Sequence, residues 1–248
     1  MSRTVLVLVP AHDEAATIAR VVEGVMRHPV DVLVVDDGST DGTADRAREA
    51  SAEVLSLAPN RGKGLALQEG FRIARDRGYR AVVTIDGDME HDPADIPRFL
   101  DALEPGVDLV VGQRNVYRSW RRRLLNGFAN FWCRRIDARI TDTHCGFRAL
   151  GPRAFAEATV PFGGFEFEQM QLLEAYRRAL RVTFLPVAVR TSARTGVGLR
   201  DIVRANDAFD HWVLAHVDEL RLPAWKRRFL RAAARVGLVL GRVLKWAT

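Results

Sequence analysis

The sequence has only two cysteines in 248 residues, Cys133 and Cys145, and their separation does not match a metal-binding spacing. No stretch approaches the roughly 18 apolar residues that a membrane-spanning helix needs. The N-terminus runs straight into an apolar strand pattern and shows no signal-peptide pattern. We therefore expect a cytoplasmic protein whose two thiols are reduced.

Two further absences narrow the class. No G-x-G-x-x-G follows the first apolar run, which disfavours a dinucleotide-dependent oxidoreductase. Residues 225–248 contain seven basic residues and no acid, which leaves 30 basic and 31 acidic residues in the rest of the chain. The net charge of +6 therefore belongs to the tail, and a generally basic nucleic-acid-binding surface is not expected.

Short apolar runs alternate with helical patterns over the first 115 residues. Strands are expected at residues 4–9, 31–35, 53–57, 81–85 and 107–111. This alternation predicts an α/β fold with a doubly wound, mostly parallel sheet. A polar cluster follows each of several strands, and ligands bind beyond the carboxyl ends of strands in such sheets. Helices at 119–139, 165–179 and 199–220, a loop with a short strand at 141–148 and a strand at 181–189 are expected to follow.

Three acids at alternate positions, Asp86, Asp88 and Glu90, follow the strand at 81–85. In an extended chain they point the same way, and their mutual repulsion favours a bound divalent cation. The alternative is an acidic turn before a helix, with Asp92 as its N-terminal cap and Pro93 in its first turn.

The tail, residues 225–248, has a helical pattern. Most of its basic residues fall within an arc of about 100°, opposite an apolar face that includes Trp225, Phe229, Leu230 and Val236. This pattern predicts a basic amphipathic helix that lies on a membrane surface with acidic headgroups. The alternative is a helix that packs on the protein's own core.

The chain resembles family 2 glycosyltransferases, and more narrowly the polyprenyl-phosphate (dolichyl-phosphate) mannosyl- and glucosyltransferases. The resemblance covers about residues 4–200 and rests on six segments in the family's order: 9–14 (VPAHDE), 34–42 (VVDDGSTDG), 60–64 (NRGKG), 86–88 (DGD), 112–114 (GQR) and 142–148 (DTHCGFR). It implies a GT-A fold, with residues 1–115 as the nucleotide-sugar-binding half and 116–224 as the acceptor-binding half of the same domain.

The resemblance also implies roles for individual residues. The family positions that contact the nucleoside correspond to Pro10, His12 and Glu14. Those around the base and ribose correspond to Val35 and Asp37. The metal and diphosphate site falls on Asp86, Gly87 and Asp88, with Arg114 near the phosphates. Lys63 is either a solvated loop residue or a nucleotide contact, since glycine-flanked lysines recur at phosphate sites.

Three departures from the family's pattern bear on the site. The family often has tyrosine at His12 and glutamine at Glu90, and a third acid at residue 90 increases the demand for a cation. We therefore expect dependence on Mg²⁺ or Mn²⁺, with Asp86, Asp88 and Glu90 as ligands. Where the family has a Ser-Arg pair, this sequence has Asn126-Gly127. Arg123 is a candidate to replace the lost charge.

The implied reaction is the inverting transfer of a hexose, mannose or glucose, from a GDP- or UDP-sugar to polyprenyl phosphate. Arg148 and Arg194 are candidates for the acceptor phosphate, and Asp142 is a candidate to orient Arg148 or the acceptor. A surface salt bridge is the alternative for Arg148. The expected location is the cytoplasmic face of the plasma membrane. The alternatives are a family member with a soluble or polysaccharide acceptor, and a non-catalytic nucleotide-sugar-binding module.

Overall fold

The computed structural model describes residues 4–114, 130–158, 160–164, 166–190 and 199–247, the last with side chains described only for 206–238. Its elements follow one another in this order: β1 (Val5–Ala11), α1 (Ile18–Val25), β2 (Asp31–Asp37), α2 (Thr43–Glu49), β3 (Glu53–Leu57), α3 (Lys63–Asp76), β4 (Ala81–Thr84), η1 (Pro93–Asp95), α4 (Ile96–Ala102), β5 (Leu109–Arg114), β6 (Arg148–Leu150), α6 (Pro152–Glu157), α7 (Glu166–Arg177), β7 (Val182–Val187), α8 (Leu199–His216) and α9 (Ala224–Ala247).

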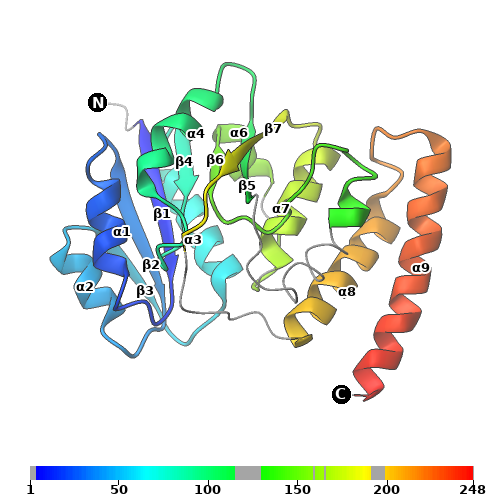
Figure 1. Cartoon of the computed structure of the whole chain (residues 1–248), viewed down its shortest axis with the longest axis horizontal. Helices are drawn as coiled ribbons and strands as arrows, with labels where there is room; N and C mark the ends of the chain where they lie inside the picture. Colours follow the sequence, from blue (N-terminus) through cyan, green and yellow to red (C-terminus); the bar gives the residue numbers. More distant parts are fainter. Residues whose placement is uncertain (1–3, 115–129, 159, 165, 191–198, 248) are drawn as a thin grey trace.

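One sheet of seven described strands, in the order β3-β2-β1-β4-β6-β5-β7, forms the centre of the protein (Figure 1). Every neighbouring pair is parallel except the two pairs made by β6, which runs antiparallel to both β4 and β5. The predicted α/β fold with a mostly parallel sheet is therefore confirmed. The strand at 53–57 has the predicted bounds, and the helix α6 was not predicted.

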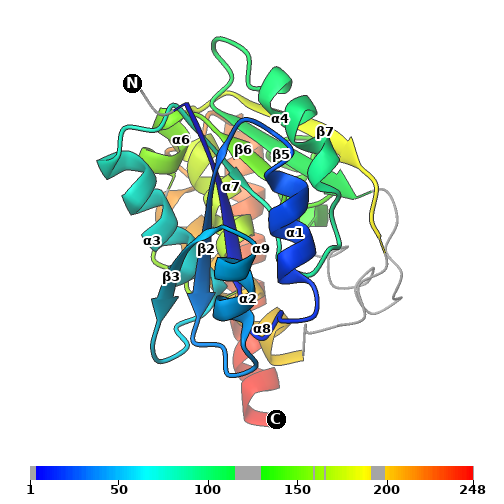
Figure 2. The same cartoon turned by 90° about the vertical axis from the view of Figure 1, so that its left-hand side faces the viewer.

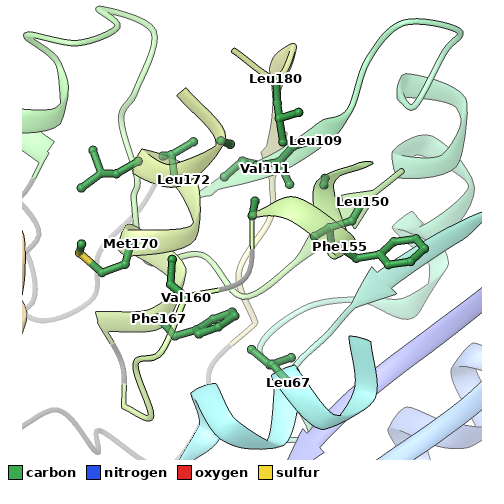
Figure 3. Close-up of a cluster of buried hydrophobic side chains, with 14 of the residues drawn as sticks. Leu67, Leu109, Val111, Leu150, Phe155, Val160, Phe167, Met170, Leu172 and Leu180 are labelled. Carbon is green, nitrogen blue, oxygen red and sulfur yellow. The ribbon is translucent and has the colours of Figure 1, made fainter. Parts of the chain in front are cut away.

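Helices cover both faces of the sheet, and the strands are apolar on both sides for this reason (Figure 2). In β1, Leu6 and Leu8 face the core under α3, α6 and α7, while Val7 and Val9 face the core under α1 and α4. Figure 3 shows the first core, to which Leu67 of α3, Phe155 of α6 and Phe167 of α7 all contribute. The packed faces of the central strands hold in place the carboxyl edge on which the polar residues gather.

The antiparallel strand β6 brings a distant loop to this edge. Arg148, its first residue, pairs with Thr84 at the end of β4 and with Val111 in β5. Because β6 runs the opposite way, the loop before it, residues 141–147, lies at the carboxyl ends of β4 and β5. Three segments that are far apart in sequence therefore meet there.

The tail helix α9 packs along α8 (Figure 1). Leu230 and Ala234 on one side of α9 are 2% and 1% exposed, whereas Trp225, Phe229 and Val236 remain exposed. The helix predicted for the tail is thus present, and Leu230, assigned from sequence to the membrane-facing side, packs into the core instead. No helix among the described residues is both long enough and apolar enough to cross a membrane.

The contact between α8 and α9 predicts a pH-dependent stability. Asp210 of α8 packs against the backbone of α9 at Gly237, and burial, followed by the charge of Asp207, raises the pKa of Asp210 to about 7 despite the opposing effect of His211. An unfolded chain binds this proton only below about pH 4, so stability should fall as the pH rises from about 4 to about 7. Asp210→Asn should raise the melting temperature at about pH 8 and change it little at about pH 5. Equal shifts at both pH values would contradict this assignment.

Candidate active site

The acidic segment after β4 does not stay extended. Met89 has a positive φ of 62°, so the backbone turns between Asp88 and Glu90. Asp88 accepts a hydrogen bond from the backbone amide of Glu90 at 2.9 Å. Glu90 is 6% exposed, and its carboxylate lies 3.3 Å from Nη1 of Arg114. The prediction that all three acids face one cation is therefore wrong for Glu90, because this turn removes the alternation on which it rested.

Lys63 lies between two carboxylates. Its Nζ is 2.6 Å from Oδ1 of Asp86 and 2.6 Å from Oε1 of Glu168, which is 3% exposed. Burial acts to lower the pKa of Lys63, but the charges of Asp86 and Glu168 outweigh it and raise that pKa above its usual value. Burial likewise opposes ionisation of Asp86, and Lys63 and His91 more than offset it, so the pKa of Asp86 is lowered. The sequence indicated Lys63 and Asp86 separately, and the structure brings them together with Glu168, which was not predicted.

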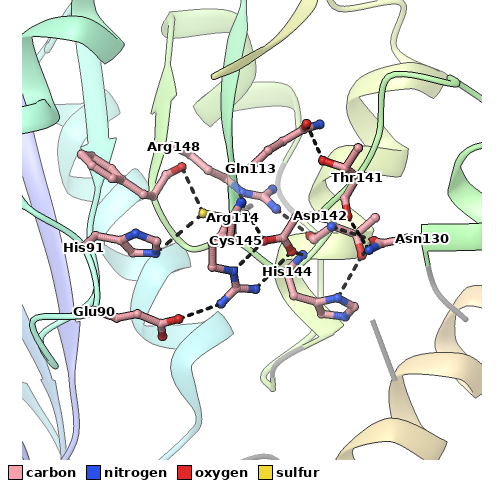
Figure 4. Close-up of polar contacts among 12 residues, drawn as sticks. Glu90, His91, Gln113, Arg114, Asn130, Thr141, Asp142, His144, Cys145 and Arg148 are labelled. Atoms are coloured by element: carbon pink, nitrogen blue, oxygen red, sulfur yellow. Dashed lines mark hydrogen bonds and ion pairs between the residues drawn. The ribbon is translucent and has the colours of Figure 1, made fainter. Parts of the chain in front are cut away.

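Arg114 is held from two sides at the end of β5 (Figure 4). Its Nε and Nη2 donate to the two carboxylate oxygens of Asp142 at 2.5 and 3.1 Å. Asp142 is 0% exposed and also accepts the backbone amide of His144 at 3.1 Å. Burial opposes its ionisation, but Arg114 overrides this and lowers the pKa of Asp142. Asp142 thus orients Arg114, whereas the sequence suggested that it would orient Arg148 or the acceptor.

Arg148 is 1% exposed and is surrounded by protein acceptors. Its guanidinium donates to the carbonyls of Cys145 at 2.9 Å, Glu168 at 2.8 Å and Thr143 at 2.9 Å. A fourth bond, of 3.1 Å, goes to the side-chain oxygen of Gln171. These contacts support neither the predicted contact with an acceptor phosphate nor the surface salt bridge. They tie the loop before β6 to the first turn of α7, which carries Glu168.

The glycine-rich loop at 60–64 is fixed by Asp37. The two carboxylate oxygens of Asp37 accept the backbone amides of Arg61 at 2.8 Å and Gly62 at 2.6 Å. Across the loop, the amide of Gly64 donates to the carbonyl of Gly163 at 2.8 Å, and a Cβ at Gly64 would collide with the backbone there. The glycine is therefore required by the close approach of two backbones, and the loop delivers Lys63 to Asp86.

The nucleoside contacts implied at the ends of β1 and β2 lie together, because these strands are neighbours. His12 is exposed, with Nε2 3.6 Å from Oδ2 of Asp13. Pro10 and Val35 are buried and lie opposite each other in the pairing of β1 with β2. The carboxylate of Glu14 accepts the hydroxyl of Thr17 at 3.1 Å.

Two glycines stand close to the acidic residues. Gly87 packs against Ala11 and Ile18, beside the end of β1. A Cβ at Gly146 would lie 2.6 Å from Oδ2 of Asp86, so Gly146 backs the carboxylate directly. Gly146 was not singled out from sequence because its partner lies 60 residues away. Arg123 and Arg194, the remaining predicted substrate contacts, lie outside the described residues.

Two carboxylates remain for a cation. Asp88 is partly buried, and burial together with the charge of Asp86 raises its pKa. A cation beside the pair would relieve this repulsion, and Mg²⁺ is often held by one or two carboxylates together with substrate phosphates. In the part of the chain that the structure describes, no group of three or more His, Cys, Asp or Glu side chains could hold a metal ion. The residues therefore fit a cation held by Asp86 and Asp88 and completed by a ligand from outside the chain.

A sheet of this order, with its polar cluster at the carboxyl edge, is the architecture of GT-A glycosyltransferases. Glucosyl-3-phosphoglycerate synthase from Mycobacterium tuberculosis, solved with Mn²⁺, uridine diphosphate and glucosyl-3-phosphoglycerate, has a TM-score of 0.70, with 23% sequence identity, over 89% of this chain and 81% of that one. The family model for glycosyl transferase family 2 matches residues 6–155. The chain belongs to glycosyl transferase family 2.

Three curated relatives illustrate the similarity. Glycosyltransferase AglJ of Haloferax volcanii is 33% identical over 189 residues, which is 73% of this chain and 61% of that protein. Polyprenol monophosphomannose synthase of Mycolicibacterium smegmatis is 35% identical over 160 residues, 58% of this chain and 60% of that protein. Undecaprenyl-phosphate mannosyltransferase of Micrococcus luteus is 31% identical over 201 residues, which is 74% of this chain and 82% of that protein. The matches thus span about three fifths of the first two relatives.

Proposed function

We propose that this chain transfers a hexose, mannose or glucose, from a GDP- or UDP-sugar to polyprenyl phosphate, with inversion at the anomeric carbon. The proposal rests on one observation above all: Lys63, Asp86 and the Arg114–Asp142 pair converge at the carboxyl edge of the sheet. Its support from relatives is that two of them are named as polyprenyl-phosphate mannose transferases.

Some residues at this edge supply positive charge, and others hold those charged side chains in position. Lys63 stays protonated beside Asp86, and Arg114 stays charged because Asp142 raises its pKa against the effect of burial. Two fixed cations beside a leaving diphosphate stabilise the charge that develops there. Asp86 and Asp88 would hold the divalent cation, which when bound supplies further positive charge at the diphosphate.

A phosphate acceptor is consistent with the state of Asp142. A hydroxyl acceptor needs a base to remove its proton, and this base would have to be Asp142 or another acid of the site. The carboxylate of Asp142 is instead occupied by Arg114 and its pKa is lowered, which makes it a poor base. A phosphate monoester already carries negative charge near neutral pH and needs no such base. This observation favours polyprenyl phosphate over a soluble hydroxyl acceptor.

The proposed location is the cytoplasmic face of a membrane, with the exposed side of α9 against the lipid. To test the reaction, the protein is incubated with labelled GDP- and UDP-hexoses and polyprenyl phosphate, and the products are extracted into organic solvent. Label in the organic phase is the expected result. Label only on a water-soluble acceptor would support the alternative acceptor class. Nucleotide-sugar binding without any transfer would support a binding module.

The metal requirement of the reaction should depend on Asp88 but not on Glu90. EDTA should abolish transfer, and Mg²⁺ or Mn²⁺ should restore it. Asp88→Asn should raise the metal concentration needed for half-maximal activity by about tenfold or more, because it removes one of two carboxylate ligands. Glu90→Gln should leave this concentration within about twofold, since Glu90 faces Arg114. Full activity in EDTA, or an equal shift in both variants, would contradict the assignment.

A further inference from the structure

A continuous row of aromatic side chains connects α9 with the segment before the site loop. The ring centroids of Phe131 and Trp132 lie 5.2 Å apart, and those of Trp132 and Phe229 lie 5.8 Å apart. Trp225 and Val236 lie on the same face of α9 as Phe229, because positions 225, 229 and 236 differ by one and two further turns. We call these five residues, Phe131, Trp132, Trp225, Phe229 and Val236, the aromatic patch.

The aromatic patch is unusually exposed for its composition. Phe131 is 46% exposed, Trp225 66%, Phe229 45% and Val236 59%. Of the five large hydrophobic side chains that are exposed in the described residues, only Met26 lies elsewhere. The opposite side of α9 is already packed through Leu230 and Ala234. The helix is therefore docked on the domain by one face and presents a second apolar face outward, which marks an interaction surface.

Charge identifies the kind of partner. Arg227 and Arg231 of α9 lie beside Asp218, so the protein itself neutralises them in part. Arg228 and Arg235 are exposed, on the edge of the aromatic patch, and neither forms an ion pair within the part of the chain that the structure describes. Lys226 stands over the ring of Trp225 at 5.8 Å. Exposed aromatic rings bordered by cations suit a bilayer surface with anionic headgroups.

A second copy of this chain is a poorer occupant. In a two-fold dimer the same patch meets itself, so the arginines of one copy would face those of the other. Like charges across an interface oppose association. A lipid surface carries the opposite charge and accepts the aromatic side chains without needing a complementary shape.

The aromatic patch also lies next to the site. Asn130, the residue before Phe131, donates to the carbonyl of Thr141 at 2.5 Å and accepts the amide of Thr143 at 3.1 Å. These two threonines flank Asp142, which holds Arg114. A surface that begins at Phe131 is therefore joined by direct hydrogen bonds to the loop that orients a site arginine.

We propose that the aromatic patch, bordered by Lys226, Arg228 and Arg235, docks the protein on an anionic lipid bilayer through both α9 and the helical turn at 130–133. This goes beyond docking by the tail alone, and it rests on the proposed function only in that the acceptor is a lipid phosphate. Docking through both elements holds the loop at 141–147 close to the membrane, where such an acceptor would present its phosphate.

The test measures binding of the full chain to vesicles without nucleotide sugar. Vesicles of phosphatidylcholine with phosphatidylglycerol should bind the protein, and salt should weaken the binding. Phe131→Ser and Trp225→Ser should each weaken partitioning by about tenfold. Met26→Ser is the matched control, because Met26 is 48% exposed but lies at the end of α1, and it should change little. Arg228→Gln should weaken binding by about fivefold. Arg80→Gln is its control, because Arg80 is also exposed but stands directly before β4, outside both α9 and the turn at 130–133.

The results of the vesicle-binding test can be distinguished from results that bear on the proposed sugar transfer. Transfer to acceptor dispersed in detergent should be unchanged in the patch variants, because among the described residues none of the patch side chains contacts Lys63, Asp86 or Arg114. Absence of vesicle binding, or equal loss in Met26→Ser, overturns the docking surface and leaves the reaction standing. Loss of binding in Trp225→Ser but not in Phe131→Ser overturns the contribution of the turn at 130–133. A change in self-association without a change in vesicle binding would assign the patch to a second copy.

Discussion

Replacing Asp86 by asparagine should lower kcat/KM for sugar transfer by about a thousandfold. Asp86 is the one side chain of the site that contacts Lys63 and also belongs to the pair proposed to hold the cation. The amide is nearly the same size but carries no charge, so it binds a cation weakly and no longer balances Lys63. Lys63 keeps Glu168 as a partner at 2.6 Å, and for this reason the variant should still fold.

Asp76→Asn is the matched control for this prediction. Asp76 lies at the end of α3, is about half exposed, and pairs with Arg72 at 3.0 Å. The same change of chemistry there should leave kcat/KM within about twofold, since exposed ion pairs contribute little. If Asp86→Asn retained more than about a tenth of the native kcat/KM, with an unchanged circular dichroism spectrum, the central role of Asp86 would be wrong.

The sheet and its carboxyl edge could be predicted because the signal is local. The central parallel strands β1, β2 and β4 are short apolar runs buried on both faces, and polar residues such as Asp37, Asp86 and Arg114 stand at or just after the ends of parallel strands. Parallel strands place their carboxyl ends at one edge, so spatial closeness followed from the class of fold. The place of β6 in the sheet gave no comparable signal. This strand has only three residues, and its position between β4 and β5 depends on pairing with strands up to 68 residues away.

The partners of individual side chains could not be predicted for a different reason. The alternation of Asp86, Asp88 and Glu90 implied a common direction only while the backbone stayed extended, and the positive φ of Met89 ends that condition. Glu168 reaches Lys63 because α7 begins beside the loop at 60–64, which is a tertiary contact. In α9, the helical period defined the faces, but only packing against α8 showed that Leu230 points inward.

Arg148→Met should lower the free energy of unfolding by about 3–5 kcal/mol, with a smaller direct effect on chemistry. Arg148 is almost fully buried and donates four hydrogen bonds, three of them to backbone carbonyls of two separate segments. Methionine fills similar space but donates none, so buried carbonyls would lose their partner at about 1–3 kcal/mol each. Arg148→Lys should recover only part of the loss, because an ammonium cannot reproduce the planar fork.

Arg153→Met provides the comparison, because Arg153 of α6 is about half exposed and lies 3.5 Å from Asp108. It should change the free energy of unfolding by less than about 0.5 kcal/mol in urea denaturation. If Arg148 bound the acceptor phosphate instead, Arg148→Met would leave stability nearly unchanged and raise the KM for polyprenyl phosphate. The positioning role predicts the reverse: a large fall in stability, and near-native KM for the fraction of protein that remains folded. Measuring both quantities on the same preparation therefore decides whether this arginine belongs to the scaffold that presents Glu168 and Asp142 or to the acceptor site itself.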